Sequence, residues 1–230
     1  MLCLATGFCA FTEPRKDSLG DNTVYEESYF EDFFFPYHLS QVHFAKTFVY
    51  ESLGDKFPKY NGEPPVTVRS ALGARSIPHS FGWFASVMMG AQFCLLNKLD
   101  MVYVEQDALI YRLKDALEFA KGKKIVYGYG KDVSWCENWA EHSFFYVSNS
   151  YLSTFLSALN GSRIHENVRA VPEVLWHSLF KDVADFWEFG CGRRRPIPFD
   201  GDGPLFAQQL RRHEIEKFKE KLDGLLNGKG

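Results

Sequence analysis

Short apolar segments alternate with helical segments along most of this chain, and this alternation restricts its possible folds most strongly. The segments expected to form strands are Met1–Phe8, Lys46–Ser52, Pro65–Ser70, Met101–Glu105, Lys124–Tyr129 and Ser143–Ser148. The segments expected to form helices are Phe81–Leu96, Leu113–Lys121, Ser150–Asn160, Pro172–Phe180 and the charged tail Leu205–Leu226, with Tyr25–His43 assigned loosely as helix plus loop. Strands that alternate with helices predict an α/β/α sandwich of the Rossmann-like kind, with a central, mixed but mostly parallel sheet. The length of 230 residues and the 46% hydrophobic content suit a single domain over residues 1–230.

One long uncharged stretch raises the question of a membrane span. No Lys, Arg, Asp or Glu occurs from Ser76 to Asn97, which is long enough to cross a bilayer. Polar residues and Pro78 restrict the strongly apolar part to about Phe81–Leu96. A segment of that length favours a buried helix of a soluble domain, so we expect no transmembrane segment.

The overall charge argues against one class of partner. The formal net charge of −3 argues against a protein that depends on bulk electrostatic attraction to nucleic acid, and we expect no nucleic-acid partner. The local basic clusters Arg193–Arg195 and Arg211–Arg212 fit either a solvated surface or contacts with substrate phosphate.

The cysteines indicate the compartment. Their number is odd, they form no C-x-x-C pair, and they stand at Cys3, Cys9, Cys94, Cys136 and Cys191. Scattered thiols of this kind are typical of reduced, mostly buried cysteines rather than of a disulfide framework or a zinc site. The N-terminal residues also lack the features of a secretory signal, so we expect a cytoplasmic protein.

Two carboxylates stand at the end of the predicted apolar strand Met101–Glu105, of which Glu105 is the last residue. Glu105 and Asp107 are separated by one residue, so their side chains would point to the same face if the strand continued. Two hard oxygen donors on one face suit Mg²⁺ or Mn²⁺, which proteins commonly share with substrate phosphates. Two acids at this spacing are also common as surface loop charges without a binding role. The residues alone leave both interpretations open.

With this acidic triplet behind a buried strand, the sequence resembles the GT-A glycosyltransferases, whose D-x-D motif closes a central strand. Glu105-Gln106-Asp107 would be an E-x-D variant of that motif. The order around it is similar as well: a loop at Gly73–Ser80, the helix Phe81–Leu96, the strand, the triplet and the helix Leu113–Lys121. The resemblance covers roughly Val66–Phe180.

The resemblance implies a divalent metal and a nucleotide-sugar donor. Mn²⁺ or Mg²⁺ would be held by Asp107 and Glu105, with Asp107 the stronger candidate because the last acid of the family motif usually contacts the metal. The donor would be a UDP- or GDP-sugar. The residues implied to contact it are Thr6 and Gly7 at the exit of the first strand, Arg75, His79 and Ser80 before the apolar helix, and Glu105 and Gln106. Ser80 equally suits a plain helix N-cap.

An acceptor-activating base is the remaining element that the resemblance implies. Glu173 follows Pro172 in the first turn of a predicted helix, where inverting GT-A enzymes keep their catalytic carboxylate. Together with Asp107 it completes the expected catalytic set, although favourable placement on the helix dipole explains an acid there equally well. Glu141 and Glu166 are the next candidates, and inversion is the expectation rather than a deduction.

The sequence therefore predicts a metal-dependent glycosyltransferase that moves a sugar from a nucleotide-diphosphate sugar to a carbohydrate or glycoconjugate acceptor. A nucleotidyltransferase of similar α/β fold is the first alternative, although no glycine-rich phosphate loop with a lysine follows the first strand. A non-catalytic carbohydrate-binding protein, in which the acidic pair is structural, is the second. Oligomeric state is undetermined, and Asn227–Gly230 would suit a domain taken from a longer chain.

Overall fold

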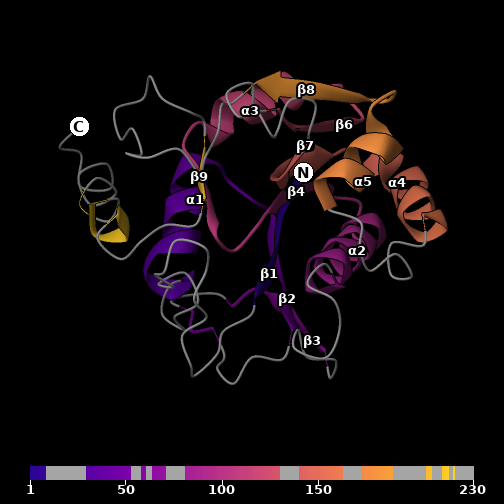
Figure 1. The fold of residues 1–230 in the computed structure, drawn as a ribbon. Coiled ribbons are helices and arrows are strands. Elements are labelled where there is room, and N and C mark those ends of the chain that lie inside the picture. Colours follow the sequence, from indigo (N-terminus) through magenta and orange to yellow (C-terminus); the bar gives the residue numbers. More distant parts are fainter. Residues whose placement is uncertain are drawn as a thin grey trace.

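A seven-stranded mixed sheet forms the centre of the computed structural model (Figure 1). The structure describes residues 1–8, 30–52, 58–60, 64–70, 81–129, 140–162, 172–188, 206–208, 214–217 and 220. The strand order is β3-β2-β1-β4-β7-β6-β8. β7 runs antiparallel to both of its neighbours, while the other adjacent pairs are parallel. The α/β class and the mostly parallel mixed sheet are thus confirmed.

The elements agree closely with the sequence pattern. The strands are β1 (Leu2–Phe8), β2 (Lys46–Ser52), β3 (Val66–Ser70), β4 (Asp100–Val104), β5 (Ala108–Ile110), β6 (Ile125–Tyr129), β7 (Ala140–Val147), β8 (Ala184–Glu188) and β9 (Phe206–Gln208). The helices are the π-helix η2 (Phe30–Phe34), α1 (Phe35–Gln41), α2 (Phe81–Leu96), α3 (Leu113–Ala120), α4 (Asn149–Gly161) and α5 (Pro172–Phe180). Gly122, with a φ of 76°, follows α3 in the left-handed conformation that glycine adopts most easily.

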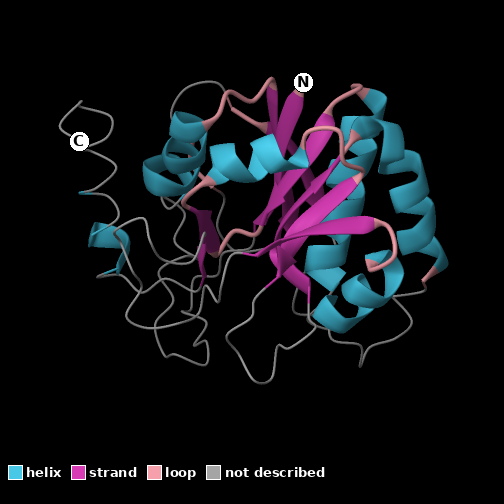
Figure 2. Ribbon diagram, turned by 90° about the horizontal axis from the view of Figure 1, so that it is seen from above, coloured by secondary structure: helices cyan, strands magenta, loops and turns pink. Residues whose placement is uncertain are grey.

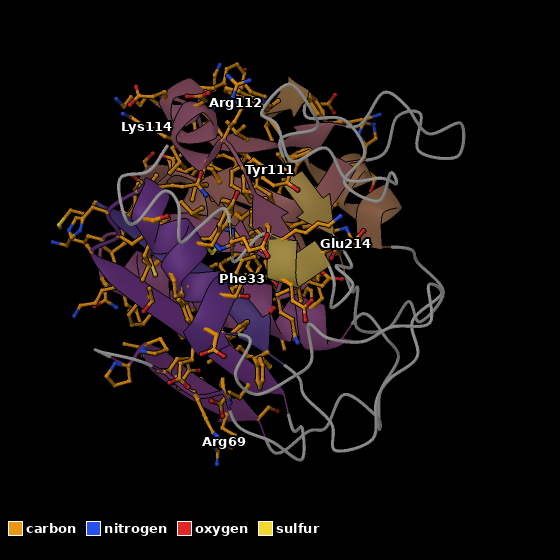
Figure 3. The ribbon with its side chains drawn as sticks, turned by 90° about the vertical axis from the view of Figure 1, so that its left-hand side faces the viewer. Phe33, Arg69, Tyr111, Arg112, Lys114 and Glu214 are labelled. Atoms are coloured by element: carbon orange, nitrogen blue, oxygen red, sulfur yellow. The ribbon has the colours of Figure 1, made fainter. Side chains whose placement is uncertain are left out.

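Helices cover both faces of the sheet, which gives the expected three layers. Figures 1 and 2 show α2, α4 and α5 on one side of the strands and α1 and α3 on the other. Figure 3 is seen from the α1–α3 side, with Phe33 and Tyr111 on this face, Arg112 and Lys114 near one end and Arg69 near the other. Each layer has its own apolar core, because alternate residues of β1 and β4 point to opposite faces.

The uncharged segment is a buried helix with the predicted limits. α2 spans Phe81–Leu96 and packs on β1, β2, β4 and α4. Within the described ranges, no helix has the length and apolar content needed to cross a membrane. Cys3 of β1 and Cys94 of α2 are free thiols buried in the core between α2 and the sheet.

Several short elements differ from the sequence prediction. β5, β8 and β9 are strands that the pattern did not predict. The tail from Leu205 was expected to be helical, but its beginning forms β9, which pairs antiparallel with β5. Helix is present further on, at residues 214–217. The local sequence of the tail suits a helix, and the backbone partners that β5 offers override this preference at β9.

α1 fixes β5 and the start of α3 through two polar side chains. His38 is fully buried; its Nδ1 lies 2.8 Å from the Phe34 carbonyl oxygen, and its Nε2 accepts from the Ile110 amide at 3.3 Å. Gln41 donates to the Ile110 carbonyl at 2.8 Å and accepts from the Leu113 amide at 3.1 Å. These bonds satisfy backbone groups on both sides of the β5–α3 connection.

The buried imidazole of His38 predicts a specific loss of stability in acid. Burial lowers the pKa of His38 to about 4, against the opposing bond to Phe34, whereas the unfolded chain titrates near 6.5. The unfolded state therefore binds the proton first. The free energy of unfolding should decrease as the pH falls from about 6.5 towards 4, with this group contributing on the order of 3 kcal/mol.

Urea unfolding of the wild type and His38→Gln at pH 7.5, 6, 5 and 4.5 measures this contribution. The variant should have a shallower pH dependence over this window, whatever its absolute stability. His43→Gln, at an exposed histidine that follows α1, should keep the wild-type slope. If the free energy of unfolding had the same pH dependence in the wild type and His38→Gln, His38 would not be the cause of the loss of stability in acid.

Candidate functional site

The candidate site lies at the carboxyl edge of the parallel strands, where the acidic triplet follows β4 beside the neighbouring strand β1. In open α/β sheets this edge is where ligands bind. Two helices also begin at this edge. α2 begins here because it must return the chain to the start of β4. α5 likewise begins here and ends beside the amino end of β8.

Glu105 begins a tight turn rather than ending the strand. β4 ends at Val104, one residue earlier than the pattern predicted. The Glu105 amide donates to the Ser143 carbonyl at 2.9 Å, and the Ala108 amide donates to the Glu105 carbonyl at 3.0 Å. The E-x-D triplet therefore lies in the turn between β4 and β5, with Gln106 buried and Asp107 partly exposed.

β7 supplies two side chains to Glu105. The Ser143 hydroxyl donates to Glu105 Oε2 at 2.7 Å, and His142 Nε2 lies 3.2 Å from Oε1. Consecutive residues of a regular strand point to opposite faces, so they would not both reach one carboxylate. A break in register between β6 and β7 accounts for it: Tyr127 pairs with Phe145, but Gly128 pairs with Glu141. Such a bulge redirects side chains next to a site.

An aromatic contact chain links this cluster to two helices. Trp83, in the first turn of α2, meets the His142 ring edge-on with centroids 4.9 Å apart. Trp83 also contacts Trp176 of α5, with centroids 5.6 Å apart. Trp176 is fully buried and packs on Phe145 of β7 at 4.4 Å. The start of α2 and the middle of α5 are therefore both held against β7.

Tyr103 is the buried residue of β4 two positions before Glu105. Its hydroxyl is 2.7 Å from the Ser86 hydroxyl, which donates to the Trp83 carbonyl at 2.7 Å. Burial raises the pKa of Tyr103 well above its ordinary value. The negative charge of Glu105 adds to this rise, and that of Asp107 does so to a smaller degree, while the Ser86 bond opposes it. Both acids of the triplet therefore act on the same buried phenol.

The two predicted contacts on β1 have structural roles. Thr6 is fully buried and its hydroxyl donates to the Gly7 carbonyl at 3.2 Å. A Cβ placed on Gly7 would lie 3.0 Å from both Cβ and Oγ of Ser86 and 3.7 Å from the Tyr103 hydroxyl. Close approach of α2 to the end of β1 therefore explains glycine at this position, alongside the nucleotide contact expected from the sequence.

Other predicted site residues fall outside the described part of the chain. These are Arg75, His79 and Ser80, the acid Glu166, and the basic clusters at 193–195 and 211–212. Glu173 is the second residue of α5, so its backbone lies at the carboxyl edge, but its side chain and that of Glu141 are not described.

The donors in the described part of the site suit a metal that is shared with a ligand. Among the described residues, no three His, Cys, Asp or Glu side chains are grouped as a metal cage. Two carboxylates on one turn match the sparse protein coordination of Mg²⁺, which usually keeps waters and substrate phosphate oxygens as its other ligands.

Sequence reasoning missed the partners of Glu105. Ser143 was expected only as the first residue of a strand, and neither His142 nor Ser86 carries a motif. An additional ion pair lies at the same edge: Arg69 Nε of β3 is 3.0 Å from Glu51 Oε2 of β2. Local sequence holds no signal for contacts that depend on strand register.

Comparison with known proteins identifies the fold. No family model and no curated protein matches the sequence. A glycosyltransferase involved in the glycosylation of the major capsid of PBCV-1 has a similar structure, with a TM-score of 0.50 and 10% identity over 96% of this chain and 98% of that one. The CTP:phosphocholine cytidylyltransferase LicC from Streptococcus pneumoniae has a TM-score of 0.51 and 10% identity over 96% and 99%. The fold is thus a Rossmann-like α/β fold that this glycosyltransferase and this cytidylyltransferase also adopt.

The contact of Gly7 with Ser86 predicts a steric cost at the end of β1. Gly7→Ala should lower the free energy of unfolding by roughly 1–3 kcal/mol, because the buried Ser86 must move to admit the methyl group. Removing the obstacle in Gly7→Ala/Ser86→Gly should give a smaller loss than the sum of the single changes. Gly161→Ala, where a Cβ meets nothing within 4 Å, is the matched control and should be neutral or stabilising. Additive losses in guanidinium unfolding would contradict the predicted contact.

Proposed function

We propose that this protein is a glycosyltransferase that transfers a sugar from a nucleotide-diphosphate sugar to a carbohydrate or glycoconjugate acceptor. The observation that carries the proposal is the position of Glu105 and Asp107 on the turn that leaves the central strand, beside the end of β1. The carboxylates of Glu105 and Asp107 also raise the pKa of the buried Tyr103 hydroxyl, after the larger effect of burial, as expected for two acids close to the same group. The fold, which the capsid-glycosylating enzyme also adopts, is consistent with this chemistry.

Asp107, with Glu105, would hold Mn²⁺ or Mg²⁺. When bound, such an ion neutralises charge that develops on a leaving diphosphate. The residues fit this role because both are hard oxygen donors, they occupy one short turn, and Asp107 is partly exposed. The protein itself would orient the donor at the carboxyl edge through Gln106 on the turn and Gly7 on the neighbouring strand β1. Arg75, His79 and Ser80 are further candidate contacts.

Glu173 is the proposed base for the acceptor hydroxyl. The start of α5 faces the same edge as the acidic turn, and the packing of Trp176 fixes that helix against β7. A carboxylate that removes the acceptor proton on the side opposite the leaving group would give inversion.

Nucleotidyl transfer is the second candidate, and the similarity of fold to a cytidylyltransferase favours it specifically. Paired carboxylates at this edge would serve that reaction too, with pyrophosphate as the leaving group. The products separate the two candidates. Release of a nucleoside diphosphate from a nucleotide sugar supports glycosyl transfer, and release of pyrophosphate from a nucleoside triphosphate supports the alternative.

A thermal-shift screen tests the proposed donor site. UDP, GDP, CDP and their sugars are tested with and without Mn²⁺ on the wild type and Asp107→Asn. One nucleotide should raise the Tm only when Mn²⁺ is present, and Asp107→Asn should abolish the rise. A ligand at 100 times its Kd stabilises by about 2.7 kcal/mol, and each kcal/mol is worth about 2–4 °C in a chain of this size.

Asp182→Asn is the control variant. Asp182 is exposed in the turn before β8, at the opposite edge of the sheet, so this change removes the same charge away from the site. It should keep the full metal-dependent shift. Stabilisation without Mn²⁺, or stabilisation that survives in Asp107→Asn, would contradict the assigned metal ligand.

A further inference from the structure

We propose that Ser143 and His142 are positioning residues of this site: they hold the Glu105 carboxylate and, through it, the turn that presents Asp107. The metal-binding part of this inference rests on the proposed function. The clamp itself is a property of the described residues and can be tested separately.

Glu105 is held through both its side chain and its backbone. Ser143 binds Oε2 at 2.7 Å, and the His142 ring stands 3.2 Å from Oε1. Ser143 also accepts the Glu105 amide through its own carbonyl at 2.9 Å. The side chains of Glu105 and His142 are only 18% and 8% exposed, and Ser143 is fully buried. Hydrogen bonds to a carboxylate are strong in such sheltered surroundings, so its orientation is fixed.

The position of Asp107 depends on this anchor. The turn closes between the Glu105 carbonyl and the Ala108 amide, so only two residues lie between its ends. On the far side, His38 and Gln41 hold the Ile110 backbone. The segment from residue 105 to residue 110 is therefore fixed at both ends, and Ser143 with His142 forms the fixed point closest to the acidic pair.

The β7 bulge makes the clamp possible. Without the register break at Tyr127 and Gly128, His142 and Ser143 would point to opposite faces of the sheet. Trp83, from the first turn of α2, then packs edge-on against the imidazole ring. A bulge, a second element that contacts the ring and two contacts to one carboxylate together indicate a built arrangement. Mutation of a residue that hydrogen-bonds a metal ligand in this way typically lowers metal affinity about 10–100-fold.

A double-mutant cycle on Glu105→Gln and Ser143→Ala tests the coupling. Mn²⁺ affinity is measured by electron paramagnetic resonance with the nucleoside diphosphate that stabilises the protein most. Ser143→Ala should weaken Mn²⁺ binding about 10–100-fold. In the Glu105→Gln background the same change should add little, because the carboxylate that it serves is absent. Ser148→Ala, at a partly exposed serine just after β7 whose hydroxyl lies 3.1 Å from that of Ser150, is the control and should bind Mn²⁺ like the wild type.

Hydrogen–deuterium exchange gives a readout that needs neither metal nor nucleotide. In Ser143→Ala, and in His142→Ala, a peptide covering Glu105–Ala108 should exchange faster than in the wild type, while a β1 peptide should be unchanged. Unchanged exchange, or equal Mn²⁺ losses in both backgrounds of the cycle, would overturn the positioning role. Faster exchange in a protein that binds no nucleotide with Mn²⁺ would support the clamp and overturn the proposed function.

Discussion

β4 is buried on both faces, and this constraint determines where the chain can place a charge. Met101, Val102, Tyr103 and Val104 are each at most 1% exposed, with alternate residues in the two cores. An ionised group between them would have to be desolvated without a partner, at a cost of several kcal/mol. The acids therefore stand at the strand's two ends.

These two ends serve different purposes. At the amino end, Asp100 Oδ1 accepts the Asn149 amide at 2.7 Å and so satisfies a free donor at the start of α4. At the carboxyl end, Glu105 is bound by β7 and the following turn carries Asp107 onto the partly exposed edge. The same residue type is thus a structural cap at one end and a candidate for binding at the other. The topology of a parallel sheet, which directs ligands to the carboxyl edge, distinguishes them.

Most of the fold could be predicted because its main elements have strong local signals. Phe81–Leu96 and Pro172–Phe180 have the predicted limits, since an apolar run and a proline at a helix start act within a few residues. β5 and β9 have three residues each, too few for a periodic pattern, and each depends on the other for its backbone partners. β8 is a sheet edge that carries Asp185, which pairs with Lys123, so its sequence lacks the continuous apolar run of a central strand.

Only part of the candidate site could be predicted from the sequence, because only that part has a local signal. Glu105 and Asp107 are neighbours along the chain, and their position after a buried strand is a local fact. Ser143 is 38 residues away from Glu105, and its contact requires β7 to be antiparallel, adjacent to β4 and bulged. Strand direction and register are set by the whole sheet, so no spacing in the sequence encodes them.

The contact chain from Glu105 to α5 bears on how a transferase of this fold would be organised. His142 touches Glu105, Trp83 touches His142, and Trp176 touches Trp83. If Asp107 binds the donor's metal and Glu173 activates the acceptor, this series of side-chain contacts sets the separation between the two substrates. Core aromatic packing resists small displacements, because protein interiors are close-packed and a change in one side chain shifts its neighbours. A change at Trp176 would then alter the relative position of donor and acceptor without touching either one, whereas a change at Ser143 would affect the donor side alone.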